Sequence, residues 1–196
     1  MRALIFDLGG VVLGSPLEVI AGYERENQIP DGTINRHVAS LKDGGAWGRH
    51  ERGEIDFASF CDLFEAELAS AGVVVDPAVL MARIASFASP RPAVLEEIRR
   101  LRSGGYKVCA LTNSWESLPT SSLGEHFDFL VESWREGVRK PDREIFARTL
   151  ERLGVSAQEA LMVDDLGPNL KVAREMGMET FKASDEDALL AFLWTL

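Results

Sequence analysis

The sequence lacks a long hydrophobic run. No stretch of its 196 residues approaches the roughly 18 consecutive apolar residues that a membrane-spanning helix needs. The apolar residues after Arg2 are interrupted by Asp7, and no A-x-A site follows them, so the amino-terminal segment is not typical of a signal peptide. We therefore expect a chain without a membrane partner.

Cysteine is scarce as well. The two cysteines, Cys61 and Cys109, lie in apolar company at unrelated positions. They are expected to be buried free thiols rather than a disulfide, which fits a reducing compartment such as the cytoplasm. The sequence also shows no internal repeat and no low-complexity tract, and its 196 residues fit one domain, or one domain with a sizeable insertion.

Positive charge is in deficit. The chain has 21 Lys and Arg against 31 Asp and Glu, which gives a formal net charge of −10. This balance argues against nucleic acid or an anionic membrane surface as a partner. It does not exclude phosphate ligands, because a bound metal ion or a few fixed donors can reverse the local field.

Short apolar segments alternate with amphipathic helical patterns over much of the chain. Helices are expected at Pro92–Ser103, Asp142–Leu153, Pro168–Met176 and Asp185–Leu193. Strands are expected at Ala3–Phe6, Lys107–Leu111, Phe129–Val131, Leu161–Val163 and Thr180–Lys182. This alternation predicts an α/β fold with a doubly wound, Rossmann-like parallel sheet.

The segment from 15 to 89 shows helical patterns, such as Leu17–Asn27 and Asp56–Ala71, but no convincing series of strands. Four apolar residues of the second pattern fall on one face and predict a helix packed in a core: Phe57, Phe60, Phe64 and Leu68. We therefore predict a core domain formed by residues 1–14 and 90–196, with an all-helical cap domain, residues 15–89, inserted after the first strand.

Polar side chains follow several of the predicted strands. Taken singly, each has a simpler explanation, such as a turn, a helix cap or a solvated lysine. Parallel strands, however, bring their carboxyl ends to one edge, where ligands bind in open α/β sheets. That edge would hold Asp7, Thr112, Asn113, Lys140, Asp164 and Asp165. Three carboxylates repel one another unless a cation joins them, and Mg²⁺ fits this set of ligands.

The order of four motifs, F-D-L-G-G-V, L-T-N-S, R-K-P-D and V-D-D-L-G-P-N-L, resembles the haloacid dehalogenase superfamily of hydrolases over the whole chain. The detail of the last two looks closest to a branch that includes the phosphatase domain of soluble epoxide hydrolase and a related domain of an acyl-CoA dehydrogenase family member. The helical insertion looks like the cap domain of that superfamily. The resemblance implies a cytoplasmic, magnesium-dependent phosphatase of a small phosphorylated metabolite, as a monomer or a homodimer.

The resemblance also implies residue roles. Asp7 would be the nucleophile that forms an aspartyl-phosphate, and Lys140 would offset charge between it and the phosphate. Magnesium would be bound by Asp7, the backbone carbonyl of Gly9 and Asp165, with support from Asp164 and Asn169, and the phosphoryl group would be bound by Thr112 and Asn113.

The chain departs from the family pattern at Gly9, where most of these phosphatases carry an aspartate that protonates the leaving group. General acid–base help is typically worth about 10²–10⁴-fold in rate. Three hypotheses remain open. The substrates have good leaving groups, such as acyl phosphates; a cap residue, His37, His50 or Glu51, supplies the proton; or the chain is a weak phosphatase that mainly binds a phosphorylated ligand.

Two other activities are weighed against the phosphatase. In a metal-free haloacid dehalogenase the two negative charges of Asp164–Asp165 would be electrostatically unfavourable. A nicotinamide-binding protein would need a G-x-G-x-x-G motif, which is absent after the first strand. A catalytically inactive phosphate-binding module is the stronger alternative.

In the cap, Trp47, His50 and Arg52 either face the active site, with Arg52 contacting a second anionic group of the substrate, or form a loop between two helices.

Overall fold

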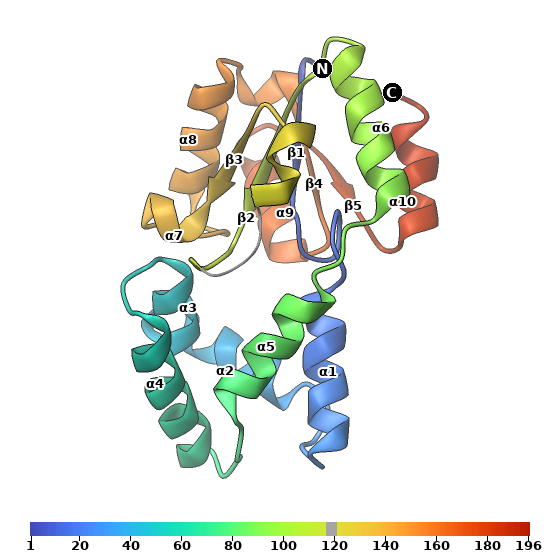
Figure 1. Cartoon of the computed structure of the whole chain (residues 1–196). Helices are drawn as coiled ribbons and strands as arrows, with labels where there is room; N and C mark the ends of the chain where they lie inside the picture. Colours follow the sequence, from blue (N-terminus) through green and yellow to red (C-terminus); the bar gives the residue numbers. More distant parts are fainter. Residues whose placement is uncertain (117–120) are drawn as a thin grey trace.

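The computed structural model describes residues 1–116 and 121–196. Five strands form one fully parallel sheet in the order β3-β2-β1-β4-β5 (Figure 1). The strands are β1 (Ala3–Phe6), β2 (Lys107–Thr112), β3 (Phe129–Glu132), β4 (Ala160–Asp164) and β5 (Glu179–Lys182). The predicted doubly wound α/β fold is therefore confirmed, and each predicted strand is present with its ends shifted by no more than one residue.

The two faces of the sheet are buried by alternate residues of the central strand. Leu4 and Phe6 of β1 pack on one face and Ala3 and Ile5 on the other, and all four are fully buried. A parallel sheet covered on both faces needs such a continuous apolar run, which explains why β1 reads A-L-I-F without a polar residue. The first polar side chain, Asp7, comes only where the strand ends.

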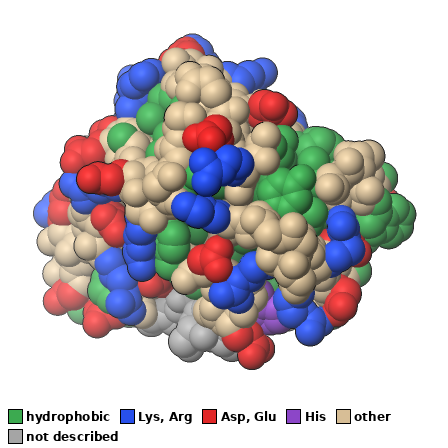
Figure 2. All heavy atoms as spheres, turned by 90° about the horizontal axis from the view of Figure 1, so that it is seen from above, with side chains coloured by type: hydrophobic (Ala, Val, Ile, Leu, Met, Phe, Trp, Pro, Cys, Tyr) green, Lys and Arg blue, Asp and Glu red, His purple; other side chains and the backbone are tan. Residues whose placement is uncertain are grey.

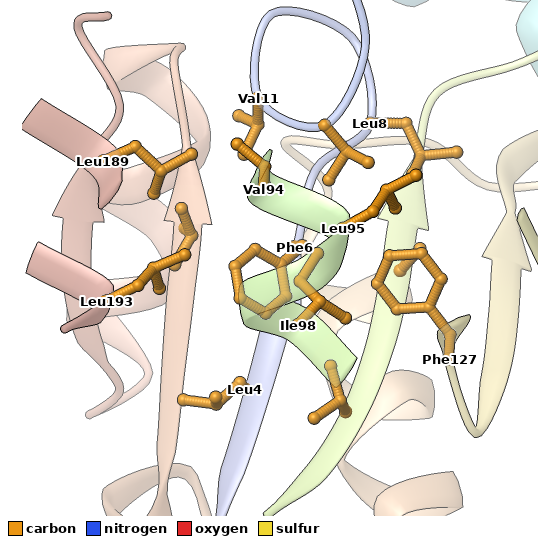
Figure 3. Packing of buried hydrophobic residues seen from close by; sticks show 14 of the residues in the cluster. Leu4, Phe6, Leu8, Val11, Val94, Leu95, Ile98, Phe127, Leu189 and Leu193 are labelled. Atoms are coloured by element: carbon orange, nitrogen blue, oxygen red, sulfur yellow. The ribbon is translucent and has the colours of Figure 1, made fainter. Parts of the chain in front are cut away.

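Helices on both sides complete the core. The face with Leu4 and Phe6 is covered by α6 (Pro92–Ser103) and α10 (Glu186–Leu193), where Ile98 packs beside Phe6 (Figure 3). The opposite face is covered by α8 (Arg143–Leu153) and α9 (Gly167–Glu175). The short α7 (Ser133–Glu136) follows β3, and 3₁₀ turns occupy Lys42–Gly44, Ser121–His126 and Ala157–Glu159.

Five helices between β1 and α6 lie beyond the carboxyl ends of the strands (Figure 1) and are called the cap helices below. They are α1 (Pro16–Glu26), α2 (Thr33–Leu41), α3 (Ala46–Glu51), α4 (Phe57–Ser70) and α5 (Pro77–Phe87). They enclose a separate hydrophobic cluster centred on Phe60, Phe64 and Leu68. The predicted stripe on α4 is therefore confirmed for these three residues. It is wrong for Phe57, which is 42% exposed because it lies in the first turn, ahead of the packed part of the helix.

The segment around Trp47 is helical rather than a loop. Trp47 and His50 lie within α3, whose close packing depends on a glycine: a Cβ atom at Gly48 would lie 2.8 Å from the carbonyl oxygen of Lys42. Both rings pack against Phe60 of α4. The prediction of a connecting loop failed because this six-residue helix is stabilised by such tertiary contacts rather than by its own periodicity.

The remaining expectations about composition can be compared with the structure. Both cysteines are free; Cys109 is buried, whereas Cys61 is partly exposed. No helix in the described parts of the chain is long and apolar enough to cross a membrane. Figure 2, which shows the end of the core remote from the cap helices, has basic and acidic side chains interspersed rather than a basic patch.

Truncation of the core should be costly. Ile98→Ala removes a fully buried side chain between the sheet and α6, and it should lower the free energy of unfolding by about 2–5 kcal/mol. Val74→Ala is the control, because Val74 is 85% exposed and its truncation should change stability by less than about 0.5 kcal/mol. Denaturant titration measures both; equal effects would contradict the packing described here.

Candidate active site

The site lies where three neighbouring strands end. Phe6 pairs with Ala110 of β2 and with Val163 of β4, so the residues after them are brought to one edge. The amide of Asp7 donates to the carbonyl oxygen of Val163 at 2.9 Å, which fixes Asp7 against the end of β4. The register of the sheet therefore places Asp7 beside Asp164, as the positions of the predicted strands require.

Lys140 joins the two carboxylates. Its ammonium nitrogen lies 2.9 Å from Oδ1 of Asp7 and 2.8 Å from Oδ2 of Asp164, and its side chain is 1% exposed. An unpaired buried ammonium would be strongly destabilising, so the two carboxylates are what allows this lysine inside the protein. Lys140 is thus fixed between two acidic groups rather than solvated.

Asn113 holds the main chain of Lys140. The side-chain amide of Asn113 donates to the carbonyl oxygen of Lys140 at 2.9 Å and accepts from its backbone amide at 2.8 Å. This reciprocal pair uses the side-chain oxygen and nitrogen of Asn113 to position the lysine. Thr112 is also buried at the end of β2. With the described residues its hydroxyl makes a single, long hydrogen bond, 3.3 Å, to the carbonyl oxygen of Asn113, and it is therefore nearly free for a ligand.

The two aspartates at the end of β4, Asp164 and Asp165, differ in the hydrogen bonds that their carboxylates accept. The carboxylate of Asp164 accepts from Lys140, from the side chain of Asn169 at 3.0 Å and from the backbone amide of Leu166 at 2.8 Å. The side chain of Asp165 makes no hydrogen bond with any other described residue. Asp164 is therefore held as a fixed part of the framework, whereas the carboxylate of Asp165 remains available to a ligand.

Asp7 also keeps one oxygen available. Its Oδ1 accepts from the backbone amide of Leu8 at 2.7 Å and from Lys140, whereas Oδ2 has no hydrogen-bond partner among the described residues. Asp7, Asp164 and Asp165 each offer an oxygen atom within 4.8 Å of the other two. The three carboxylates thus form one compact group at the end of the sheet.

Gly10 makes room for this group. A Cβ atom at Gly10 would lie 2.3 Å from Oδ2 of Asp165, closer than any real contact, and the residue has a φ of +76°, which other residues rarely adopt. The second glycine of the G-G pair is thus needed for Asp165 to approach the turn after β1.

Burial and crowding shift the titration of the site. Burial raises the pKa of Asp7 to about 8; Lys140 opposes this shift and Asp164 adds to it. Burial and the charge of Asp164 raise the pKa of Asp165 to about 6. Burial on its own lowers the pKa of Lys140, but Asp164 and Asp7 outweigh it and raise that pKa. One ammonium therefore does not compensate the three carboxylates.

This imbalance fits a bound divalent cation. Mg²⁺ is coordinated by oxygen atoms, commonly one or two carboxylates together with water and a phosphate oxygen. The unbonded oxygen of Asp7 and the carboxylate of Asp165 supply such ligands, and a second positive centre would relieve the repulsion that raises both pKa values. The residues present therefore fit a magnesium ion.

A cavity of about 180 Å³ opens over the carboxylates and extends between the core and the cap helices. Asp7, Gly9, Asp165 and Asn169 line it on one side together with Thr112, Asn113 and Lys140, and Trp47 and Glu51 line it from α3. The site residues named from the sequence are thus brought together, with Asp164 immediately behind them.

The three proton donors proposed for the cap do not share this position. Glu51 lines the cavity, whereas His37 and His50 do not. The ring of His50 stacks on Phe60 at 4.6 Å in the cap cluster, and His37 lies 3.6 Å from Glu67. The two histidines are held in the cap structure by these contacts.

Arg52 is also outside the cavity lining. It donates to Glu54 at 2.7 Å and to the carbonyl oxygen of Asp43 at 2.8 Å, so the predicted contact between Arg52 and a substrate anion is not supported. The arginine that lines the cavity is Arg139, which sequence reasoning missed. Its position directly before Lys140 was the available signal, because Lys140 was already expected at this edge.

Gly9 lines the cavity at the point where the family aspartate would stand. A Cβ atom there would lie 3.1 and 3.2 Å from the ring atoms Cδ and Cγ of Pro16. Pro16 at the start of α1 therefore occupies space next to the position that a side chain at residue 9 would need. The loss of the acid and the placement of α1 are thus structurally connected.

Comparison with known proteins agrees with the motifs. The haloacid dehalogenase-like hydrolase family model matches residues 1–177. The chain is 35% identical over 205 residues to acyl-CoA dehydrogenase family member 10 of Mus musculus, covering 97% of this chain and 19% of that protein. It is 30% identical over 208 residues to bifunctional epoxide hydrolase 2 of Sus scrofa, covering 97% and 38%. The chain therefore spans well under half of either relative, and the resemblance drawn from the motifs is confirmed.

A relative of similar length and solved structures with the same fold can also be compared with the chain. The chain is 26% identical over 205 residues to a glyceraldehyde 3-phosphate phosphatase of Methanocaldococcus jannaschii, covering 93% of this chain and 84% of that protein. A HAD family enzyme of Bacteroides thetaiotaomicron has the same fold, with a TM-score of 0.71, 24% identity and 98% coverage of both chains. Another structure of that enzyme, with magnesium and inorganic phosphate, has a TM-score of 0.66, with 23% identity and coverage of 95% and 96%.

Neutralising Asp165 should stabilise the metal-free protein. Because the folded chain raises the pKa of Asp165 from 3.8 to about 6, the ionised carboxylate destabilises the fold at higher pH. Asp165→Asn should therefore raise the free energy of unfolding at pH 8 by about 1–2 kcal/mol, a range reduced for the partial exposure of the group. The gain should shrink as the pH falls from about 6 and vanish below 3.8, where the carboxyl is protonated in the folded and unfolded chains alike.

Denaturant titration in the presence of a chelator measures this difference. Asp62→Asn is the matched control, because it removes an exposed carboxylate on α4 and should leave stability unchanged. A less stable Asp165→Asn protein at pH 8 would mean that the carboxylates do not repel one another in the folded state.

Proposed function

Since this chain belongs to the family of haloacid dehalogenase-like hydrolases, we propose that it is a magnesium-dependent phosphatase that acts on a small phosphorylated metabolite. The observation that carries the proposal is the buried Lys140 fixed between Asp7 and Asp164, with the unbonded carboxylate of Asp165 beside them. This arrangement combines a nucleophile, a fixed positive charge and a cation site within one small cavity.

Magnesium would be held by Asp7 and Asp165, with the backbone carbonyl of Gly9 as a further ligand, and when bound it supplies positive charge to the phosphoryl oxygens and to the carboxylates. Asp164 and Asn169 would support the site, since the side-chain amide of Asn169 donates to both carboxylate oxygens of Asp164 and orients it toward Lys140. Thr112 offers its hydroxyl to a phosphoryl oxygen, and Asn113 acts mainly through its hold on Lys140.

The reaction has two displacements at phosphorus. In the first, a carboxylate oxygen of Asp7 attacks, a bond forms between this oxygen and phosphorus, and the bond from phosphorus to the leaving oxygen breaks, so that the leaving group departs as an oxyanion and takes its proton from solvent. In the second, water attacks the aspartyl-phosphate, which returns Asp7 as a carboxylate and releases inorganic phosphate. Lys140 stays charged through both steps and stabilises the negative charge close to Asp7.

The names of relatives support the proposal. A protein of similar length, 26% identical, is a glyceraldehyde 3-phosphate phosphatase, and an enzyme with the same fold has been crystallised with magnesium and inorganic phosphate. An inactive phosphate-binding module is the alternative that the first experiment separates.

Replacing the nucleophile should abolish turnover. Asp7→Asn keeps the shape of the side chain but removes the nucleophilic oxygen charge, so phosphate release should fall at least about a hundred-fold. Release of inorganic phosphate from a panel of sugar, nucleotide, lipid and acyl phosphates, with magnesium and with a chelator, measures the effect. The wild-type protein should lose its activity in the chelator.

Asp62→Asn is again the control and should keep the wild-type rate, because the residue lies on the exposed face of α4. Activity above a few per cent of wild type in Asp7→Asn would remove Asp7 from the nucleophile's role. No turnover on any substrate, in wild-type protein that binds magnesium, would favour the binding module instead.

The absence of an acid at Gly9 predicts a steep dependence on the leaving group. Among the described carboxylates that line the cavity, Glu51 is the only one from the cap, and it lies 2.7 Å from the guanidinium of Arg139 rather than free in the cavity. An aryl phosphate should therefore exceed an alkyl phosphate of similar size by about 10² or more in kcat/KM. Equal values for the two would show that a proton donor is present after all.

A further inference from the structure

The part of the cavity remote from the carboxylates is mainly apolar. Pro16, Leu17 and Ile20 of α1 and Val38 of α2 line it beside Trp47. With a volume of about 180 Å³, the cavity is smaller than the roughly 300–1,000 Å³ typical of sites for drug-sized ligands. A phosphate ester that fits here has a short, mostly hydrocarbon body.

The cations in this cavity are already paired. Of the described residues that line it, only Lys140 and Arg139 are basic. Lys140 is shared by Asp7 and Asp164, and Arg139 lies 2.7 Å from Glu51 and 3.5 Å from Asp43. A second anionic group on the substrate would therefore find no unpaired positive charge among these residues, and it would approach Glu51.

The contact between Glu51 and Arg139 is close but poorly aligned. Nε of Arg139 and Oε2 of Glu51 are both buried, and neither atom has a partner with hydrogen-bond geometry in the described parts of the chain. The other oxygen of Glu51 is fixed by the indole of Trp47 at 2.9 Å, so the carboxylate cannot easily turn away.

A hydroxyl group can lie beside this pair without repulsion from Glu51, because it is neutral and can both donate and accept. A carboxylate or a phosphate offers only acceptors and would bring a second negative charge beside Glu51. Asn35 of α2, which also lines the cavity, adds a neutral amide that makes no hydrogen bond with the described residues. The polar groups at this end thus match a neutral partner that both donates and accepts.

We propose that Glu51 and Arg139 select phosphate monoesters whose organic part is short, mainly apolar and ends in a neutral hydroxyl or amide, and that they reject a second anionic group. This inference rests on the proposed phosphatase function. It replaces the expectation that an arginine of the cap attracts a second anion, and it assigns to Glu51 a role in specificity rather than in proton transfer.

Three matched substrates test the selection. The phosphates of 4-(hydroxymethyl)phenol, 4-ethylphenol and 4-(carboxymethyl)phenol are close in size, and the methylene group largely insulates the leaving oxygen from the terminal substituent. We expect kcat/KM for the hydroxymethyl compound to exceed that for the ethyl compound about three-fold or more, and the carboxymethyl compound to fall about ten-fold or more below it. A carboxymethyl compound that equals or surpasses the ethyl compound would overturn the proposal.

Glu51→Gln tests the assignment to that residue. It keeps the shape and an acceptor for Trp47 but removes the negative charge, so the ratio of carboxymethyl to ethyl kcat/KM should rise about ten-fold. Asp62→Asn makes the same change of charge outside the cavity and should leave the ratio unchanged. An unchanged ratio in a folded Glu51→Gln protein would also overturn the proposal.

A binding measurement separates this proposal from the proposed function. The three correspondingly substituted benzylphosphonates, which are not hydrolysed, should bind in the same order in titration calorimetry with magnesium. The expected order of binding without any turnover would contradict the phosphatase and retain the selectivity. Turnover with the reverse order would retain the phosphatase and contradict the selectivity.

Discussion

The buried contact of Lys140 with Asp7 and Asp164 is the interaction on which the site depends. It places a positive charge where the sheet ends, and without its two carboxylates the lysine would be an isolated charge in the interior. The contact also connects three separate parts of the chain, because the lysine is held by Asn113 after β2, while the aspartates end β1 and β4. The same geometry that stabilises the lysine therefore assembles the reactive groups.

The carboxylates outnumber the charge that holds them, and this excess explains the chemistry. Both carboxylate oxygens of Asp164 accept hydrogen bonds, and Asp164 orients Lys140. Asp7 and Asp165 instead have oxygen atoms without such partners among the described residues, and their pKa values are raised. A framework that used all its acidic groups for structure would not leave an oxygen atom of Asp7 and the carboxylate of Asp165 without partners and crowded together. Without a bound cation these crowded carboxylates destabilise the site, as is common where residues serve function rather than stability.

Much of this arrangement could be predicted from the sequence, because it depends on strand ends. Once β1, β2 and β4 were placed, Asp7, Thr112 and Asp164 had to meet at one edge. The pairing of Glu51 with Arg139 could not be predicted in this way, since it depends on how α3 of the cap packs against the loop before Lys140. The division into a core and a cap domain stays a prediction, although the helices between β1 and α6 have their own hydrophobic cluster.

The account makes Asp7 the phosphoryl acceptor, and a direct test is to trap the phosphorylated chain. The protein is mixed with magnesium and an aryl phosphate, quenched in acid during turnover, digested at low pH and examined by mass spectrometry. The account predicts one added phosphoryl group on the peptide that contains Asp7, and its absence from the Asp7→Asn protein. Sustained phosphate release with an unmodified Asp7 peptide, or with the phosphoryl group on another residue, would contradict it.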